Sequence, residues 1–185
     1  MISCSMFKNA LTELIETLVL SAVIIYLIYA FVASVEVVSG SSMEPNFYTG
    51  ERILVDKVTK YYQTFERGEI VVLSPPGEDG KHFIKRIIGL PGDIIKIYDC
   101  KVYISNGVDR FVLVEPYLAT NICTNGGVQI KNGRSLKIKD DEYMVLGDNR
   151  VASVDSRFFG FIAKEDIIGR VIFRFWPISS AGFIK

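Results

Sequence analysis

The sequence predicts a mainly β domain, a compact and barrel-like antiparallel assembly, preceded by one N-terminal transmembrane helix. Three observations predict this fold class. An uncharged apolar run near the N-terminus has the length of a membrane span, short runs rich in Val, Ile, Tyr and Phe follow it, and turn residues separate those runs. No stretch after Val38 keeps a helical period for three turns.

Composition limits the function classes. The 185 residues suit one domain with a short appendage, and the 21 basic residues balance the 21 acidic residues. No basic footprint for nucleic acid is present, so we expect no nucleic-acid partner. One histidine and three scattered cysteines are too few for a zinc finger or an iron–sulfur cluster. The chemistry considered below requires no metal and no organic cofactor, so we expect neither.

The apolar run extends from Thr17 to Val35, 19 residues without a charge. At 1.5 Å per residue a helix of this length spans roughly 28 Å, close to the hydrocarbon core of a bilayer. Glu16 precedes the run and Glu36 follows it. The sequence thus predicts a short N-terminal segment, an anchor and a β domain at residues 1–16, 17–35 and 36–185.

Two other interpretations of this run are weaker. A buried core helix usually has a polar stripe, which this run lacks. A cleaved signal needs a basic start and a shorter apolar run, whereas Lys8 is the one basic residue before it. Orientation is left open by charge, because Arg52 and Lys57 beyond the run balance Lys8 and the N-terminal amine.

Strand candidates occupy most of the remaining chain. Stretch 99–134 is more polar and richer in Gly and Asn, and is predicted to be a peripheral excursion with its own hairpin. The predicted strands are Ile53–Asp56, Glu69–Leu73, Phe83–Ile88, Asp93–Tyr98, Lys101–Ser105, Arg110–Val114, Ser135–Ile138, Tyr143–Leu146 and Ile167–Phe175.

Nucleophilic chemistry is the first function to consider. A Ser-His-Asp triad would need His82, which has no motif around it and is typical of a partly exposed histidine at a strand end. A serine can use a lysine base instead, provided that burial lowers the lysine pKa from about 10.4. In the strand around Lys85 and Arg86, a period of two turns one of these two residues inward. The alternative is an edge strand with both side chains solvated.

A serine cluster directly follows the predicted anchor. Spacing alone does not choose among Ser39, Ser41 and Ser42, and a flexible juxtamembrane turn is the alternative. Gly40 lets another backbone approach closely.

A polar loop at residues 147–160 lies between two apolar strands. Asp155 and Arg157 share one side of an extended segment and are placed to pair. Such a density of hydrogen-bonding groups suits a loop that braces a site, although a solvated loop is the ordinary alternative.

Together these segments resemble the type I signal peptidases, membrane-anchored Ser/Lys leader peptidases of family S26. Three motifs match in order: GSSMEP around Ser42, IKRIIGLPGD at 84–93 and GDNRVASVDSRFFG at 147–160. The anchor before the first motif also fits. Any one motif is modest evidence, whereas all three after an anchor are highly specific.

The resemblance implies roles for the matched positions. Ser42 matches the nucleophile and Lys85 the general base. Ser153 matches the serine that orients the lysine. The pair that braces the site is matched by Asp155 and Arg157, with Asp148 in the same block.

The resemblance also implies an oxyanion hole and a substrate surface. The backbone N–H of Ser42 would hold the oxyanion, and Gly40 stands where some members have a serine hydroxyl as a second donor. Met43 and Ile84 match positions that contact substrate. An apolar surface dipping into lipid is a further expectation, with Tyr61, Tyr62, Phe65 and Trp176 as its candidates, although ordinary core packing is the alternative for each.

The implied activity is removal of signal peptides from exported preproteins, by cleavage after small residues at positions −1 and −3. The implied topology is that of the bacterial cytoplasmic membrane, with the N-terminus cytoplasmic and the catalytic domain outside. In that compartment Cys100 and Cys123 are candidates for a disulfide. The rivals are a membrane-anchored module that binds peptides without cleaving them and a self-cleaving repressor-type Ser/Lys peptidase. Oligomeric state is left open.

Overall fold

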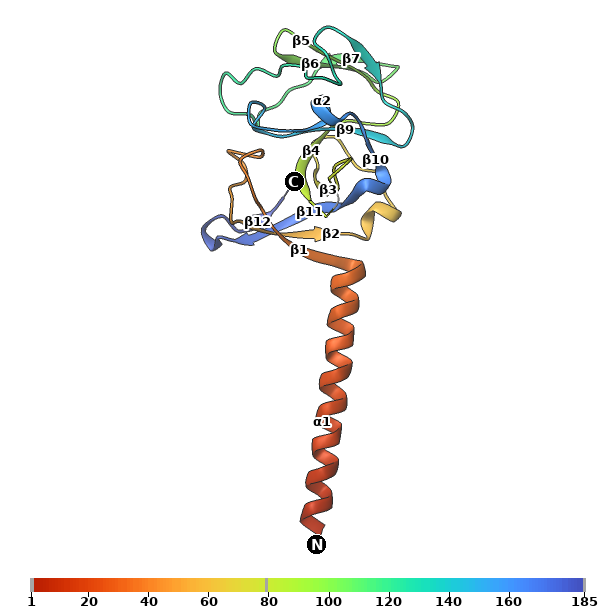
Figure 1. Ribbon diagram of the computed structural model, residues 1–185, viewed down its shortest axis with the longest axis vertical. Coiled ribbons are helices and arrows are strands. Elements are labelled where there is room, and N and C mark those ends of the chain that lie inside the picture. Colours follow the sequence, from red (N-terminus) through yellow and green to blue (C-terminus); the bar gives the residue numbers. More distant parts are fainter. Residues whose placement is uncertain (1, 79, 185) are drawn as a thin grey trace.

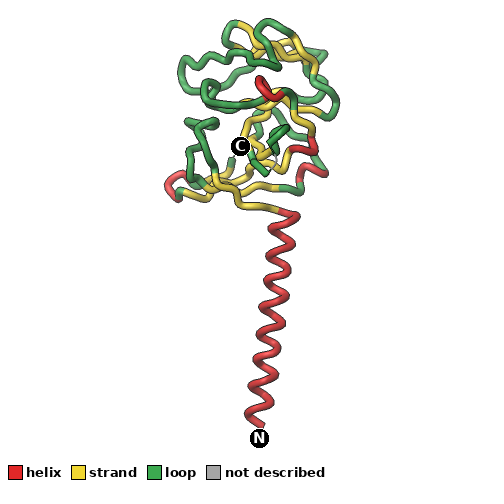
Figure 2. Tube along the Cα trace, viewed as in Figure 1, coloured by secondary structure: helices red, strands yellow, loops and turns green. Residues whose placement is uncertain are grey.

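The structure is a computed structural model that describes residues 2–78 and 80–184. A long N-terminal helix leads into a β domain, and the helix stands clear of that domain over its length (Figures 1 and 2). The helix α1 covers Ile2–Leu27 and continues as one π-helical turn, η1, over Ile28–Val32. Residues 10–32 are long and apolar enough to cross a membrane, and their side chains are not buried by the domain.

The predicted anchor differs from the observed helix at both ends. The helix extends upstream to Ile2, and it ends at Val32 rather than Val35. Ala33 adopts an extended conformation and begins strand β1, Ala33–Val37. The apolar run hid this boundary, because its hydrophobicity continues unchanged from the helix into the strand.

The main sheet is antiparallel and has eight strands in the described residues. Its order is β1-β2-β11-β3-β4-β9-β10, and β12 pairs with β11 outside this path. After β1, its strands are β2 (Arg52–Asp56), β3 (Ile70–Leu73), β4 (Phe83–Gly89), β9 (Glu142–Leu146), β10 (Ile162–Ala163), β11 (Ile167–Trp176) and β12 (Gly182–Phe183).

A second sheet of four described strands lies at the end of the domain away from α1 (Figure 1), in the order β7-β6-β5-β8. A disulfide joins Cys100 to Cys123 beside it. The predicted excursion at 99–134 is therefore slightly longer, because its outer strands begin at Ile94 and end at Lys137. Its strands are β5 (Ile94–Tyr98), β6 (Lys101–Ser105), β7 (Arg110–Val112) and β8 (Ser135–Lys137).

The remaining elements are short. Helix α2, Ser156–Phe159, lies in the polar loop that the sequence analysis expected to be extended. Three 3₁₀ turns complete the described chain: η2 (Thr59–Tyr61), η3 (Lys164–Asp166) and η4 (Ile178–Ser180).

Close packing joins the two sheets. Ile88 and Met144 of the main sheet share a buried cluster with Ile95 and Ile138. A Cβ atom added at Gly89 would lie 2.3 Å from Cδ1 of Ile138 and 2.9 Å from Cβ of Met144, so only glycine permits this approach. The second sheet is thereby fixed to the strand that carries Lys85.

Strand β4 is covered on both faces. Lys85 is 3% exposed and Arg86 is 7% exposed, although a period of two sends their side chains to opposite faces. The prediction that one of them faces inward was incomplete, because it assumed a sheet with one solvated face. β4 lies between β3 and β9 and carries apolar neighbours on both faces.

Candidate active site

Ser42 and Lys85 meet although 43 positions separate them in the sequence. Nζ of Lys85 donates a hydrogen bond to Oγ of Ser42 at 2.9 Å, and a second to the carbonyl of Ile84 at 2.9 Å. Lys85 comes from the middle of β4, whereas Ser42 begins the turn that follows β1. The fold thus places a hydroxyl and an amine within direct proton-transfer distance.

Burial changes the chemistry of Lys85. It lowers the lysine pKa to about 8, against a partial opposing effect from the negative charges of Asp155 and Asp148, while Arg157 lowers it further. In the described part of the chain, no carboxylate forms an ion pair with this amine. The face of the Phe83 ring, 5.0 Å away, is its apolar neighbour. An amine in this setting is neutral in a useful fraction of molecules near neutral pH.

The Ser42 turn is held from both sides. The carbonyl of Ser42 accepts a hydrogen bond from the amide of Asn149 at 3.0 Å, and the following turn is closed by bonds to the carbonyl of Met43. Gly40 has a φ of 87°, a conformation that disfavours any side chain, and its amide donates to Oγ1 of Thr49. Over the described residues, the amide of Ser42 has no hydrogen-bond acceptor, so it is available to an oxyanion.

Asp155 organises the loop behind the pair. Its carboxylate accepts from the amide of Gly147 at 3.0 Å and from Nε and Nη2 of Arg157 at 2.7 and 2.8 Å. It also caps α2 by accepting from the amide of Arg157, which explains why a helix replaces the expected extended segment. Both side chains are at most 4% exposed. Their pairing therefore occurs, through a helix cap rather than along a strand.

Asp148 has an equally well-defined role. It accepts a two-pronged bond from Arg86, Nε to Oδ1 at 2.8 Å and Nη2 to Oδ2 at 2.6 Å, and a third bond from Nδ2 of Asn46 at 2.8 Å. The guanidinium of Arg86 lies 4.0 Å from the ring centre of Tyr117. This cluster ties β4, the Ser42 turn and the polar loop together.

Ser153 lies beside the site without the expected hydrogen bond. Its Oγ is buried and has no hydrogen-bond partner in residues 2–78 and 80–184, and the carbonyl of Ile84 is the second acceptor for Lys85 instead. A Cβ added at Gly147 would lie 2.2 Å from this Oγ and 2.5 Å from the carbonyl oxygen of Ser42. The Ser153 hydroxyl is thus packed close to the Ser42 turn, and its orienting role stays a prediction.

A groove of about 320 Å³ leads to Ser42 and Lys85. One wall is residues 36–42, the other includes His82–Lys85, and Ala152 and Val154 of the polar loop also line it. Ile84 lines this groove, and its contact with substrate stays a prediction. Met43 does not line it, because its side chain is fully buried in the apolar cluster beneath, together with Ile53 and Val72 of the groove lining.

Both walls of the groove have a free strand edge. Among the described strands β1 pairs only with β2, so its other edge is open. Strand β9 pairs with β4 from Arg86 onward, which leaves Phe83–Lys85 unpaired on that side. An extended peptide can therefore add a strand between the walls.

Comparison with known proteins decides the family. A family model described as signal peptidase, peptidase S26, matches residues 11–176. The chain belongs to this peptidase family. S26 peptidases are hydrolases that process signal peptides, and the N-terminal apolar helix accords with membrane anchoring.

Two named relatives, each more than 30% identical to this chain, support the same assignment. A signal peptidase I of Bacillus amyloliquefaciens is 39% identical over 176 residues, covering 93% of this chain and 91% of that protein. A probable signal peptidase I-2 of Synechocystis sp. is 36% identical over 182 residues, covering 96% of this chain and 78% of that protein. Among solved structures, a signal peptidase I from Enterococcus faecalis V583 has a TM-score of 0.46 and 30% identity, covering 58% of this chain and 97% of that chain.

Part of the cluster around Asp148 was not predicted from the sequence. Arg86 had no expected role beyond its position in the strand, and Asn46 and Tyr117 had none. The signal for Arg86 was its location next to Lys85 in an apolar strand, since a buried guanidinium requires a carboxylate partner. Tyr117 was not predictable, because it comes from the excursion and reaches the site only through the packing of the two sheets.

Proposed function

We propose that this S26 peptidase is a membrane-anchored serine endopeptidase that removes N-terminal signal peptides from exported preproteins. The observation that carries the proposal is the 2.9 Å hydrogen bond between a buried lysine amine and the Ser42 hydroxyl. The relatives are named signal peptidases. We extend that activity to this chain because the Ser42–Lys85 pair supplies a nucleophile and a base for peptide cleavage.

The chemistry proceeds in two stages. Neutral Lys85 takes the proton from Ser42 as the hydroxyl oxygen attacks the carbonyl at the cleavage point. The Ser42 amide stabilises the oxyanion, and Lys85 then protonates the leaving amine. A water activated by the same lysine hydrolyses the acyl-enzyme and restores Ser42. Gly40 supplies no side-chain donor to the oxyanion.

The substrate binds as an added strand. The open edges of β1 and of Phe83–Lys85 provide main-chain partners on both sides of the groove, which favours an extended cleavage segment. Cleavage after small residues at −1 and −3 is the expected specificity, with large side chains rejected sterically by the walls, to which Ile84 contributes.

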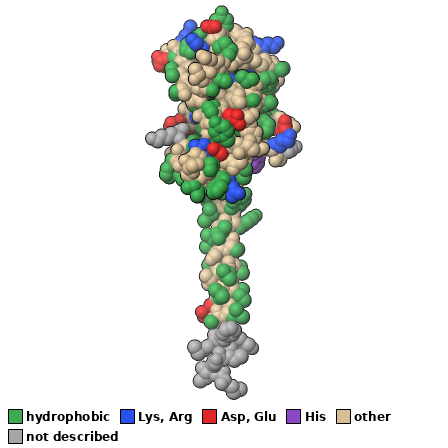
Figure 3. All heavy atoms as spheres, turned by 90° about the vertical axis from the view of Figure 1, so that its left-hand side faces the viewer, with side chains coloured by type: hydrophobic (Ala, Val, Ile, Leu, Met, Phe, Trp, Pro, Cys, Tyr) green, Lys and Arg blue, Asp and Glu red, His purple; other side chains and the backbone are tan. Residues whose placement is uncertain are grey.

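Anchoring places the site near the membrane. Nine residues lie between Val32, where the helix ends, and Ser42. Even fully extended, this segment places Ser42 at most about 35 Å from the end of the helix. Figure 3 shows apolar side chains along the coloured part of the helix. We propose that the N-terminus is cytoplasmic and the domain lies outside the bacterial cytoplasmic membrane, and the Cys100–Cys123 disulfide suits such an oxidising compartment.

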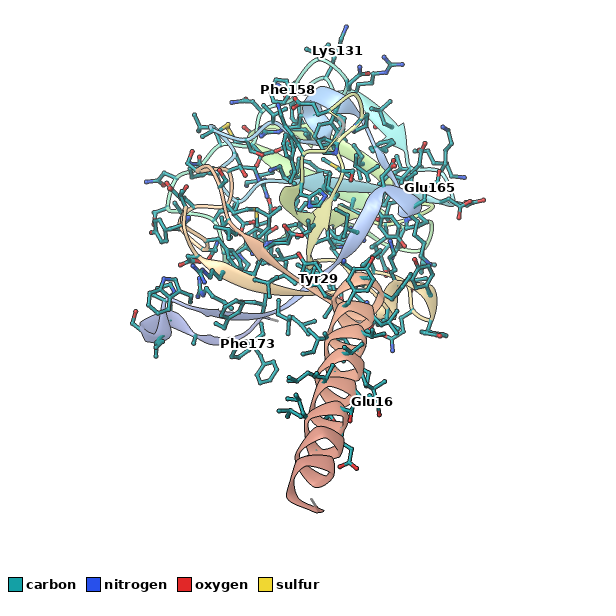
Figure 4. All side chains as sticks on the ribbon, turned by 60° about the horizontal axis from the view of Figure 1, so that its bottom comes forward. Glu16, Tyr29, Lys131, Phe158, Glu165 and Phe173 are labelled. Carbon is teal, nitrogen blue, oxygen red and sulfur yellow. A yellow bond between two sulfur atoms is a disulfide. The ribbon has the colours of Figure 1, made fainter. Side chains whose placement is uncertain are left out.

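The domain surface next to the helix also suits lipid. Figure 4 shows Phe173 projecting from the sheet on the side from which α1 leaves the domain, with Tyr29 at the junction. Trp176, Tyr61 and Tyr62 are 50%, 73% and 83% exposed, whereas Phe65 is buried at 2%. The expected lipid-facing surface therefore keeps three of its four aromatic candidates, since Phe65 packs in the core against Tyr143.

Preprotein cleavage by the full chain in detergent or lipid tests the proposal. The wild-type protein should cut after an A-x-A site, and Ser42→Ala and Lys85→Ala should each lower kcat/KM by about 10³-fold or more while the thermal unfolding midpoint does not fall. Equal cleavage by wild type and Lys85→Ala would remove the lysine from its role. Failure of the wild type on a panel of preproteins would favour a binding module.

A further inference from the structure

A polar pair spans the groove at the end nearer the anchor. Nδ1 of His82 lies 3.4 Å from Oε1 of Glu36, with side chains 43% and 26% exposed. Glu36 belongs to β1 and His82 directly precedes β4, so the pair joins the two walls. Both side chains line the groove, whose lining between them and the reacting pair includes apolar Val38, Val72 and Ile84.

The pair lies upstream of the cleavage point. Glu36 follows the last helical residue, Val32, by four positions, and Ser42 lies six positions further along the chain. On the proposed function, the substrate segment before the cut leaves the membrane and reaches Ser42 from the side of the anchor. It therefore passes Glu36 and His82 before it reaches the reacting groups.

Strand spacing fixes which substrate residue meets the pair. His82 precedes Lys85 by three positions, roughly 10 Å along an extended strand. In the proposed mechanism Ser42 attacks the carbonyl of residue −1, which places that residue beside Lys85, the hydrogen-bond partner of Ser42. Three residues of an extended peptide aligned with β4 lead from −1 to −4. The side chain at −4 is thus the one nearest the pair.

We infer that Glu36 and His82 form a polar subsite that favours signal peptides with a hydrogen-bond donor in the side chain at −4. This inference rests on the proposed function. A bound peptide covers the groove and removes water from the Glu36 carboxylate, which only accepts hydrogen bonds and has about four lone-pair positions. His82 supplies at most one donor to these lone-pair positions. A hydrogen-bond donor in the side chain at −4 occupies a second position. An aliphatic side chain at −4 leaves that position without a partner, which costs binding free energy.

The test compares two peptide substrates that share an A-x-A site and differ only at −4, where one has Gln and the other Met, which is similar in length. The readout is the ratio of their kcat/KM values, measured with the full chain in detergent. Wild type should favour Gln by about tenfold, the size of one hydrogen bond to a charged acceptor. Glu36→Val should bring this ratio close to one, because the acceptor is gone and a β-branched residue suits the strand.

A second variant gives the opposite expectation. His82→Ala removes the side chain whose Nδ1 lies 3.4 Å from Glu36 and competes with the substrate for its carboxylate, so the preference for Gln should increase rather than fall. Glu142→Val is the matched control. Glu142 is 23% exposed, close to the 26% of Glu36, and pairs with Lys139 at 2.9 Å at the start of β9. Its loss should leave the ratio at the wild-type value.

The outcomes separate this inference from the proposed function. Absence of cleavage of both peptides by wild type contradicts the proposed function itself. Cleavage of both peptides with the same ratio in wild type, Glu36→Val and His82→Ala overturns the subsite. The same two residues placed at −5, with the A-x-A site kept, locate the contact, and a wild-type preference for a donor at neither −4 nor −5 overturns the subsite as well. Should Glu36→Val fail to fold, the increase in His82→Ala decides the question.

Discussion

The groove and the loop behind it bury positive charge in opposite ways. In the groove, Lys85 is 3% exposed and its amine contacts a hydroxyl, a carbonyl and the face of a ring. Behind it, Arg157 is equally buried but forms two hydrogen bonds to the carboxylate of Asp155. Burial without a carboxylate partner lowers the pKa of a lysine and favours its neutral form, whereas burial with a carboxylate partner keeps an arginine charged and holds the loop in place.

The same contrast separates neighbours in one strand. Arg86 directly follows Lys85, and its guanidinium is paired with Asp148. A guanidinium keeps its proton under all ordinary conditions, so it cannot serve as the base. In the proposed mechanism, Lys85 must lose its proton and lies in the groove, whereas Arg86 keeps its proton and lies on the opposite face of β4.

The largest expected effect on stability comes from removing the Asp155–Arg157 ion pair. Arg157→Met leaves the Asp155 carboxylate buried without its main partner, and we expect it to lower the free energy of unfolding by about 3–5 kcal/mol. Urea unfolding followed by circular dichroism measures this change. A change below 1 kcal/mol would mean that the Asp155–Arg157 pair does not hold the loop.

The matching substitution in the groove, at Lys85, should change the free energy of unfolding in the opposite direction. The folded-state pKa of Lys85 is lowered to about 8 from an ordinary value of 10.5, so protonated lysine costs stability below pH 8 and the cost disappears above 10.5. Lys85→Met removes this cost and should raise the free energy of unfolding at pH 7, by up to about 3 kcal/mol. A loss of stability in this variant would contradict the difference between the two regions.

Catalysis should depend on pH on the acid side. Since only neutral Lys85 accepts the Ser42 proton, kcat/KM should fall about tenfold per pH unit below the lysine pKa of about 8. Initial rates on one peptide from pH 5.5 to 9.5 measure this limb. A flat profile over that range would exclude a lysine base.

The smallest effect should be that of Ser153. Its hydroxyl is buried without a partner in the described residues, so Ser153→Ala should change the unfolding free energy by less than about 1 kcal/mol and lower kcat/KM by about tenfold. Ser156→Ala is the control, because the Ser156 hydroxyl accepts a hydrogen bond from the buried amide of Val145 at 2.9 Å. The free energy of unfolding of that variant should fall by about 1–3 kcal/mol. Full activity of Ser153→Ala would remove Ser153 from the site.

Much of the fold was predictable from local pattern. The nine predicted strands all occur, with ends shifted by up to two residues, because alternation and turn residues are local signals. β1 was missed because Ala33–Val37 continues the apolar run of the helix. Helix α2 was missed because its four residues depend on the Asp155 cap rather than on a helical period.

The site was predictable only through its motifs. Nothing in the spacing brings Ser42 to Lys85, since that contact depends on how the main sheet brings β1 and β4 together. Burial of both Lys85 and Arg86 required knowing that β4 is covered on both faces. The side chain of Met43 was expected at the substrate and lies in the core, because the turn after Ser42 directs it inward.

The most direct test of the account is a titration of the Lys85 side chain itself. The intact protein, labelled with ¹³C at the lysine ε-carbons, is followed by NMR in detergent, and the Lys85→Met variant assigns the signal. We expect a midpoint near 8 that coincides with the acid limb of kcat/KM. A midpoint near the ordinary lysine value of 10.5 would contradict the claim that burial makes Lys85 the base for Ser42.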